Sequence, residues 1–374
     1  MSHHRIHLCL AKMSDNGAEQ KYIQEAFNTN WVAPLGPNVD AFEEALARYY
    51  GNDVYVAALS SCTAAIHIAL LLLGVSKDDE VLCQSFSFCA SSNPVVYCGA
   101  KPIFIDSEEE TWNMSPELLE NAIKDRIAKT GRKPKAIIVV DLYGMPAKWD
   151  EITAISKKYE IPVIEDAANA LGSTYKGKPC GTFGDIATLS FNGNKIITTS
   201  GGGAIVCKDE ATKKRAIFLA TQAKEPYLHY EHETIGFNYR MSNISAGIGR
   251  GQMTVLDKHI AHHKHVHQLY SVLLGDIVKG NFNDDFDSNF WLTTVLFKKG
   301  IDTEAFCLEL DKVGIEARPL WKPMHLQPVY KNAPAYTNGV SEKLYKTGIC
   351  LPSGPWVSDN DIRFVVDSIK ANIK

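Results

Sequence analysis

Short apolar runs alternate with longer helical patterns between Val54 and Cys207. The helical patterns are TAAIHIALLLLG from residue 63, SPELLENAIKDRI from 115 and WDEITAISKKY from 149. We expect Gly74 to end the first of these helices and Ser115 to cap the start of the second. The apolar runs between them are rich in branched residues and predict strands. They are VYVAAL (54–59), EVLCQ (80–84), KPIFID (101–106), KAIIVVDLYG (135–144), IPVIEDAA (161–168), DIATLSF (185–191) and GGAIVC (202–207). This alternation predicts an α/β fold with a mostly parallel sheet flanked by helices.

The last two predicted strands depart from that alternation. The segment that joins DIATLSF to GGAIVC is short and contains Gly193 and Gly201. An antiparallel return is easier across such a link than a helical crossover, so we expect the second strand to run antiparallel to the first. Lys195 lies in this connection, at an end or edge of the sheet.

The pattern changes after about Leu256. A long polar helix, DKHIAHHKHVHQLYSVLL, is followed by the loop-rich stretch GNFNDDFDSN and a new set of short strands and helices. A chain of 374 residues exceeds what one hydrophobic core usually holds. We therefore predict a large domain over 1–252 and a smaller C-terminal α+β domain over 253–374.

Three histidines, His259, His263 and His267, recur every fourth residue on the long helix. That spacing could in principle bind a metal. No acid or cysteine completes the set, and Lys258 and Lys264 are neighbours in the sequence. We predict a solvated basic face here and no metal site.

Composition narrows the classes of partner. The chain has 39 basic and 43 acidic residues, a net charge of -4 and no dense basic run, so neither nucleic acid nor anionic membrane is expected as a partner. The longest apolar run, residues 64–75, is too short to span a bilayer, and the N-terminus lacks the features of a secretory signal. Nine cysteines without paired spacing fit reduced thiols. We expect a cytoplasmic location.

Small hydroxyl residues join the first predicted strand to its helix. In ALSSCTAAIHIAL, Ser60, Ser61 and Thr63 stand where free backbone N–H groups and the positive end of a helix dipole would meet. This arrangement is suited to an anion. The alternative, that Ser60 or Ser61 is simply a helix N-cap, stays open.

Two acids, Glu165 and Asp166, end the predicted buried strand IPVIED. Ligands of open α/β sheets bind beyond the carboxyl ends of the strands, and a carboxylate there is costly unless it meets a cation. One of the two acids is therefore expected to need a positive partner. An acid that interacts only with the dipole of the following helix is the alternative.

An anion site, a carboxylate and a lysine in a glycine-rich turn together suit one cofactor, pyridoxal 5'-phosphate. Its aldehyde bonds to a lysine amine, its ring nitrogen needs a carboxylate to stay protonated, and its phosphate needs an anion site. Lys195, at a lowered pKa, could also carry the substrate proton from carbon to carbon. Glycines 201–203 would let the backbone pass close to the cofactor.

Five segments carry a resemblance to a known family: SFNGNKIITTSGGGA, EDAANALGS, FNYRMSNISAGIG, NWVAPLGPNV and ARPLWKPMHLQP. They closely resemble the nucleotide-sugar aminotransferases of the DegT/DnrJ/EryC1/StrS family, and the resemblance runs from about residue 15 to the C-terminus. It implies the type I aspartate-aminotransferase fold with a seven-stranded, mostly parallel sheet. It also implies a homodimer whose active sites are shared between subunits.

The resemblance assigns the cofactor residues. Lys195 matches the Schiff-base lysine, Asp166 the partner of the pyridine nitrogen, and Phe88 the aromatic that stacks on the ring, although an ordinary core phenylalanine is the alternative. Asn169 would lie near the phenolic oxygen, where the family more often has Gln, His or Glu. The residues that match the phosphate site are Ser61, Cys62 (through its backbone), Thr63, Ser190 and, from the neighbouring subunit, Asn238.

The resemblance also assigns residues to the sugar nucleotide. Arg318 can bind a diphosphate through its planar fork, and Trp31 or Trp321 can cover a sugar face or a uracil ring. A packed tryptophan is the alternative for Trp321. The full set of matched substrate residues is Asn30, Trp31, Val32, Ala33, Arg318, Pro319, Leu320 and Trp321, with Arg240 and His325 as lesser candidates.

Within the family, TQAKEPYLHYEHETIGFNYRMSN and RPLWKPMH look most like the enzymes that aminate UDP-4-keto-6-deoxy-N-acetylglucosamine at C4 on the route to bacillosamine. The resemblance thus predicts transfer of an amino group from glutamate to a UDP-linked 4-keto-6-deoxy-N-acetylhexosamine for surface glycans. Lys195 favours transamination, because some members that replace the lysine by histidine are dehydratases. Three alternatives stay open: a dTDP- or GDP-linked acceptor, a dehydratase, and a non-catalytic sensor.

Overall fold

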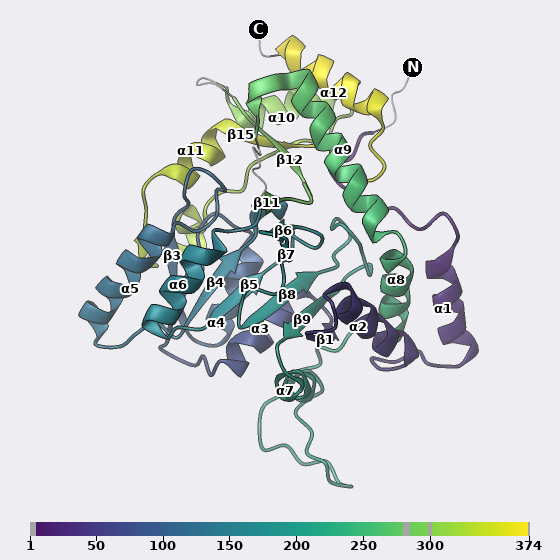
Figure 1. The fold of residues 1–374 in the computed structure, drawn as a ribbon, viewed down its shortest axis with the longest axis vertical. Coiled ribbons are helices and arrows are strands. Elements are labelled where there is room, and N and C mark those ends of the chain that lie inside the picture. Colours follow the sequence, from purple (N-terminus) through teal and green to yellow (C-terminus); the bar gives the residue numbers. More distant parts are fainter. Residues whose placement is uncertain (1–4, 280–284, 298–300, 373–374) are drawn as a thin grey trace.

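The computed structural model describes residues 5–279, 285–297 and 301–372. A large mixed sheet lies at its centre, and a second group of helices with a small sheet lies above it (Figure 1). None of the helices in these residues has the length and apolar character needed to cross a membrane.

All seven predicted strands form one sheet. The order is β1-β9-β8-β5-β4-β2-β3-β14. The bounds are β1 (Tyr55–Leu59), β2 (Glu80–Gln84), β3 (Lys101–Ile105), β4 (Ala136–Val140), β5 (Val163–Asp166), β8 (Ile186–Ser190), β9 (Gly203–Cys207) and β14 (Ala335–Tyr336). As predicted, β9 returns antiparallel to β8, and it is also antiparallel to β1. The other pairs are parallel. The predicted count of seven is one strand short: β14 comes from the C-terminal part and pairs with β3, and its two residues carry no pattern of their own.

Helices cover both faces of this sheet, because alternate side chains of each strand point to opposite faces. On one face, Ala136 and Ile138 of β4 belong to a core shared with α3 (Cys62–Leu72), α4 (Asn93–Tyr97) and α7 (Glu210–Ala220). On the other face, Ile137 and Val139 pack with α5 (Pro116–Thr130) and α6 (Trp149–Tyr159). Over β1, β8 and β9 that second face is covered by α2 (Pro37–Tyr49) and α8 (Asn243–Met253), and α1 (Ala18–Asn28) packs against α8.

Local signals decide where two of these helices begin or end. The hydroxyl of Ser115 accepts a hydrogen bond from the N–H of Leu118 at 3.3 Å, so the predicted cap of α5 is confirmed. The chain leaves α3 through Gly74, whose φ of +71° is a left-handed conformation that glycine adopts without strain.

The C-terminal part holds a smaller sheet and its own helices. The helices are α9 (Leu256–Leu274), α10 (Thr303–Lys312), α11 (Val340–Thr347) and α12 (Asp359–Asn372). The sheet has the order β10-β12-β15-β13, with β10 (Val278–Lys279), β12 (Thr293–Leu296), β15 (Gly348–Leu351) and β13 (Arg318–Pro319). Single-turn 3-10 helices occupy Cys89–Ser91, Leu142–Gly144, Gly275–Ile277, Met324–Leu326 and Pro328–Tyr330.

The division into 1–252 and 253–374 stays our proposal, and among the described residues three contacts of the β-pairing kind cross it. Ile6 forms a parallel bridge with Ile315, and β14 joins the large sheet. The third contact is a small sheet in which β11 (Phe286–Asp287) pairs with β6 (Thr174–Tyr175), next to β7 (Lys178–Pro179). Part of the predicted loop-rich stretch, 280–284, lies outside the described residues.

The predicted solvated face of the long helix is wrong, because its three histidines are buried. His263 has no exposed surface, and His259 and His267 are almost fully covered. His259 Nδ1 lies 3.0 Å from the carbonyl oxygen of Ile196, and His267 stacks on Phe290 with ring centroids 3.8 Å apart. This face of α9 therefore packs inward. Burial lowers the pKa of His263 to about 3.

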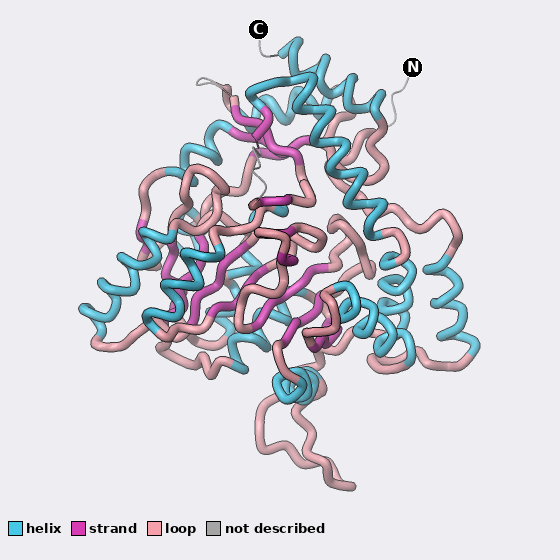
Figure 2. The backbone as a smooth tube through the Cα atoms, in the orientation of Figure 1, coloured by secondary structure: helices cyan, strands magenta, loops and turns pink. Residues whose placement is uncertain are grey.

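A long loop after α7, residues 221–236, extends away from the body of the molecule (Figures 1 and 2). It carries several apolar side chains that are at least half exposed. They are Tyr227, Leu228, Tyr230 and Ile235. Such a group of exposed apolar residues is unusual on the surface of a monomer.

Candidate active site

A cavity of about 500 Å³ opens beyond the carboxyl ends of β1, β5 and β8. The chain segment after β1, the end of β5 and the turn after β8 line it, together with Arg318, Pro319 and Trp321 of the C-terminal part. The cavity brings together many residues predicted for the site: Ser61, Cys62, Thr63, Phe88, Asp166, Asn169, Ser190, Lys195, Arg318, Pro319 and Trp321.

Lys195 stands in the turn between β8 and β9, as the spacing of the two strands predicts. Its amine Nζ lies 2.6 Å from Asn169 Oδ1 and 3.9 Å from the ring centroid of Trp291. Burial lowers the pKa of Lys195 to about 8, and the charge of Asp166 opposes that effect. A useful fraction of the amine is therefore neutral near physiological pH, as a nucleophile requires.

Asp166 ends β5 and is almost fully buried. Its Oδ2 accepts a hydrogen bond from the hydroxyl of Ser91 at 2.7 Å, and its Oδ1 accepts one from the N–H of Ala168 at 3.1 Å. Burial raises the pKa of Asp166, and these hydrogen bonds together with Lys195 oppose the rise. A cationic ring nitrogen in the cavity would hold the carboxylate ionised.

Ser61 is both a helix cap and part of the cavity wall. Its hydroxyl oxygen accepts a hydrogen bond from the N–H of Ala64 at 3.0 Å, so Ser61 caps α3 while it also lines the cavity. Thr63 and Ser190 add hydroxyls beside the first turn of α3, where backbone N–H groups lack helical partners. Burial raises the pKa of the Cys62 thiol well above its usual value, so this residue offers its backbone N–H and not a thiolate.

The donor set of the cavity fits pyridoxal phosphate. Hydroxyls and helix N–H groups suit the phosphate, the Asp166 carboxylate suits a protonated ring nitrogen, and the Lys195 amine suits the aldehyde. The residues suited to the phosphate, Ser61, Cys62, Thr63 and Ser190, form what we call the phosphate wall. This wall depends on close packing, because a Cβ on Gly203 would lie 2.5 Å from the carbonyl carbon of Ser61 and closer still to the N of Cys62.

Aromatic side chains line the side of the cavity opposite the sheet. Phe88 is 55% exposed, and the centroids of its ring and the Trp321 ring lie 5.7 Å apart. The alternative interpretation, that Phe88 is an ordinary core phenylalanine, is therefore wrong. Trp321 in turn contacts Tyr143, with ring centroids 4.8 Å apart. These rings offer a flat apolar surface to a bound ring or sugar.

Three predicted substrate residues have their side chains engaged elsewhere. Arg240 pairs with Glu43 at 2.6 Å, Leu320 is 1% exposed and packs in the core, and His325 Nδ1 lies 2.6 Å from Ser85 Oγ. None of the three lines this cavity, so the structure does not support their prediction as substrate ligands. Arg240 instead compensates the charge of a buried acid.

The segment 30–33 and Asn238 also lie away from this cavity. Asn243, at the start of α8, donates to the carbonyl of Trp31 at 2.9 Å and to that of Ala33 through its backbone N–H at 2.8 Å. Asn238 is exposed and forms a bridge with Thr221. These residues therefore do not line the cavity of their own chain.

Sequence reasoning missed several residues of the cavity wall, among them Ser91, which donates to Asp166, and Trp291, which contacts Lys195. Ser91 belongs to the run of small polar residues that follows Phe88, and this run could have indicated it. Trp291 comes from the segment between β11 and β12, far along the chain from Lys195, and no local pattern points to it.

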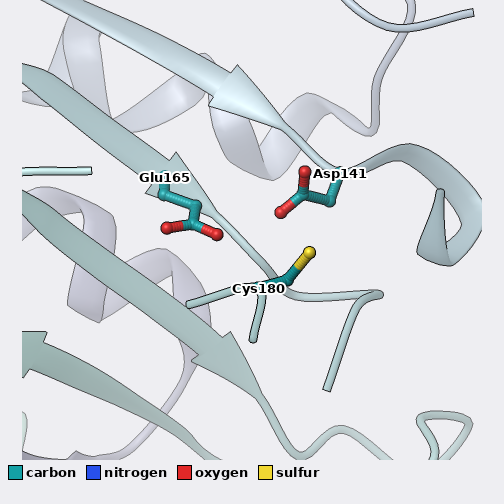
Figure 3. Close-up of side chains that lie close together, drawn as sticks. All are labelled: Asp141, Glu165 and Cys180. Carbon is teal, nitrogen blue, oxygen red and sulfur yellow. The ribbon is translucent and has the colours of Figure 1, made fainter. Parts of the chain in front are cut away.

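Glu165 points away from the cavity, toward Asp141 and Cys180 (Figure 3). Ligand atoms of these three buried residues lie within 4.8 Å of one another. The Glu165 carboxylate accepts backbone N–H groups from Gly181, Phe183 and Gly184, and thereby holds the turn before β8. Burial, and the nearby charge of Glu165, raise the pKa of Asp141 well above its usual value. Asp166, and not Glu165, is therefore the acid that faces the cavity.

Comparison with known proteins agrees with this chemistry. Residues 14–370 match the DegT/DnrJ/EryC1/StrS aminotransferase family. The chain is 49% identical over 372 residues to a Bacillus subtilis protein, EpsN, described as a pyridoxal phosphate-dependent aminotransferase, with 98% of this chain and 95% of the relative covered. It is 36% identical to the GDP-perosamine synthase of Escherichia coli O157:H7, with 94% and 95% covered.

A crystal structure of a DegT/DnrJ/EryC1/StrS aminotransferase from Brucella abortus superposes with a TM-score of 0.88 at 28% identity, and 95% of each chain is covered. The predicted type I aminotransferase fold and its cofactor, pyridoxal phosphate, are thereby confirmed. The chain belongs to the DegT/DnrJ/EryC1/StrS aminotransferase family and is a pyridoxal-phosphate-dependent sugar aminotransferase.

Proposed function

We propose that this aminotransferase moves an amino group from glutamate to C4 of a UDP-linked 4-keto-6-deoxy-N-acetylhexosamine, in the cytoplasm, for the synthesis of a glycan precursor. The observation that carries the proposal is the meeting of the Lys195 amine, the Asp166 carboxylate and the Ser61 and Ser190 hydroxyls in one cavity whose wall also includes Arg318. The choice of acceptor rests on the resemblance of residues 221–243 and 318–325 to enzymes of the bacillosamine route. The location rests on nine free cysteines, which suit a reducing compartment.

When bound, the cofactor supplies an electron sink for the carbon that bears the amino group. Asp166 would keep the ring nitrogen protonated, because a buried carboxylate is stabilised by an adjacent cation. Lys195 would bind the aldehyde and then carry the substrate proton through its Nζ atom. With a pKa of about 8 it can both accept and donate that proton near neutral pH. Ser61, Thr63 and Ser190 would hold the phosphate.

Arg318 is the cavity residue best suited to the diphosphate of the sugar nucleotide. Its guanidinium is largely exposed and pairs with Glu316 at 2.9 Å. An exposed ion pair of this kind contributes little stability, so a diphosphate can compete for the planar fork of the arginine. Trp321 would cover the apolar face of the sugar, and Phe88 would stack on the cofactor ring.

A homodimer would complete this site. Asn238 and the segment 30–33 lie outside the cavity of their own subunit. Family resemblance assigns Asn238 to the phosphate site of the neighbouring subunit and the segment 30–33 to the substrate. The loop 221–236 exposes several apolar side chains, and contact with a second copy of the chain would cover them.

A GDP-linked 4-keto sugar is the second candidate acceptor. The 36% identity to a GDP-perosamine synthase over nearly the whole chain favours it. The two acceptors differ in the base and in the group at C2, an acetamido group or a hydroxyl.

A product assay tests the proposal. Purified enzyme with the cofactor and glutamate is mixed with UDP-, dTDP- and GDP-4-keto-6-deoxy sugars in parallel, and products are identified by mass and NMR. A UDP-linked 4-amino sugar is expected, and Lys195→Ala should form none. An amino sugar formed only from the GDP-linked acceptor would establish the second candidate. A deoxygenated keto sugar, or no product at all with cofactor bound, would contradict both.

A further inference from the structure

The segment 288–291 reaches Lys195 from the C-terminal part of the chain. Trp291, which is 3% exposed, forms part of the cavity wall, and the Lys195 amine lies 3.9 Å from the centroid of its ring. The indole N–H of Trp291 donates to the carbonyl oxygen of Asn194 at 2.6 Å. One side chain therefore contacts both the amine of Lys195 and the backbone of the residue before it.

Asn289 holds this segment against the turn that contains Asn169. Its side-chain amide donates to the carbonyl oxygens of Asn169 and Leu171, each at 2.9 Å. Its Oδ1 accepts the backbone N–H of Trp291 at 2.8 Å, and its own N–H donates to Ser173 Oγ at 2.9 Å. The indole and the Asn169 turn are thus parts of one hydrogen-bonded unit.

The Lys195 amine lies between two partners that belong to this unit. Asn169 Oδ1 accepts its hydrogen bond at 2.6 Å, and the face of the Trp291 ring attracts the ammonium form. Burial is the main reason that the pKa of Lys195 falls to about 8. The amine is therefore held at one place while it remains easy to deprotonate.

We propose that Trp291 is a positioning residue for Lys195: the face of its indole ring holds the amine beside Asn169, and its N–H fixes the backbone at Asn194. This inference rests on the proposed role of Lys195 as the lysine that bonds to the cofactor. In that step the neutral amine attacks the aldehyde carbon, a carbon–nitrogen double bond forms, and one water molecule leaves. Misplacing a reacting atom by about 1 Å can cost on the order of a hundredfold in rate.

Two measurements on the apoenzyme separate positioning from structural support. Absorbance after rapid mixing gives the rate of covalent attachment of pyridoxal phosphate. Calorimetry gives the affinity for pyridoxamine phosphate, which has no aldehyde and makes no bond to Lys195. Trp291→Leu should slow attachment by about tenfold or more and change the affinity by less than about threefold. Trp291→Phe keeps a ring face and should slow attachment by only about threefold.

Trp356 supplies a matched control. The amine of Lys12 lies 5.2 Å from its ring centroid, and its indole N–H donates to the carbonyl of Ala11 at 2.9 Å, but it is exposed and lies outside the cavity. Trp356→Leu should leave both measurements unchanged. If Trp291→Leu fails to fold, Trp291→Met refills the space without a ring and carries the same prediction.

Two results would overturn the inference. One is attachment at the native rate in Trp291→Leu or Trp291→Met, and the other is an equal fold-loss in attachment and in affinity for pyridoxamine phosphate. A separate experiment tests the proposed role of Lys195, on which this inference rests. Borohydride reduction followed by peptide mapping of Lys195→Ala shows whether the cofactor still attaches to the protein and where. Attachment that persists at another residue would overturn the role of Lys195 and with it that of Trp291.

Discussion

Gly203 gives the sharpest test of how the phosphate wall is built. It is the first residue of β9 and pairs with Leu59 of β1 on one side and Ser190 of β8 on the other. A Cβ at this position would lie 2.5 Å from the carbonyl carbon of Ser61 and 2.7 Å from the carbonyl oxygen of Leu189. Both contacts are to backbone, so neither can be relieved by a change of side-chain rotamer. Gly203→Ala must therefore move β9 or the segment that begins α3.

The expected cost follows from that geometry. Ordinary contacts of a Cβ lie beyond about 3.4 Å, so the backbone has to shift by nearly 1 Å at a strand that is paired on both sides. Forcing an extra methyl group into a packed region costs about 1–3 kcal/mol, and the paired backbone places this site near 3 kcal/mol. The shift also moves Ser61 and Ser190, so we expect the affinity for the cofactor to fall about tenfold.

Denaturant unfolding of the apoprotein measures the loss of stability, and calorimetry with pyridoxamine phosphate measures the affinity. Gly193→Ala is the matched control, because a Cβ there would meet only the carbonyl oxygen of Ser200, at 3.8 Å, and Gly193 does not line the cavity. It should change stability by less than about 0.5 kcal/mol. Native stability and affinity in Gly203→Ala would refute the packing argument.

Four further predictions concern charged and titratable groups. The rate of covalent attachment of the cofactor should rise with pH and level off above about pH 8, because only the neutral form of Lys195 attacks the aldehyde. A rate that still rises at about pH 10 would mean that the amine keeps its ordinary pKa. Asp166→Asn should retain bound cofactor but lower kcat by at least about a hundredfold, because an amide cannot keep the ring nitrogen protonated. A kcat within about tenfold of the native value in a steady-state assay would contradict this role of Asp166. Asp141→Asn should change the free energy of unfolding by less than about 1 kcal/mol, because the amide oxygen can accept the same N–H groups of Ala147 and Trp149 that Asp141 Oδ1 accepts. Asp141→Ala removes this acceptor and should cost about 2–3 kcal/mol, and equal losses in the two variants would refute the reasoning. The pKa of His263 is about 3 in the folded state, so His263 should favour unfolding as pH falls below about 6.5, because only the unfolded state gains the proton there. In denaturant titrations from about pH 7 to 4, His263→Leu should lose less stability than the native protein. An identical dependence of stability on pH in the two proteins would disprove this prediction.

The mostly parallel sheet, its antiparallel return and the strand-end position of the site could be predicted from the sequence. Runs such as KAIIVVDLYG are apolar on both faces, which is the pattern of a strand buried between two helical layers, and the short link around Lys195 favoured an antiparallel return. Residues such as Ser61, Asp166 and Lys195 follow strands directly, so their meeting at one edge of the sheet followed from the parallel order of those strands. The cofactor followed from the chemistry of these three groups.

The contacts between distant segments could not be predicted in this way. His259 and His263 look like members of a polar helix, and they are buried only because α9 packs against the turn after Lys195 and against residues 290–291. Glu165 and Asp166 are neighbours in the sequence, but the alternation of a strand sends them to opposite faces, and only the packing of each face shows which acid meets the cofactor.

The features that the sequence alone could predict are local. They are the strands and helices, which follow from the spacing of apolar residues, the antiparallel return, and the residues that follow each strand. Local signals suffice there because backbone geometry and hydrogen bonding decide those features over a few residues. The tertiary structure alone decided that Trp291 faces Lys195, that Asn289 joins it to Asn169, and that β14 extends the sheet. These contacts join residues far apart in the chain, and they depend on how layers and segments pack, which no short stretch of sequence encodes.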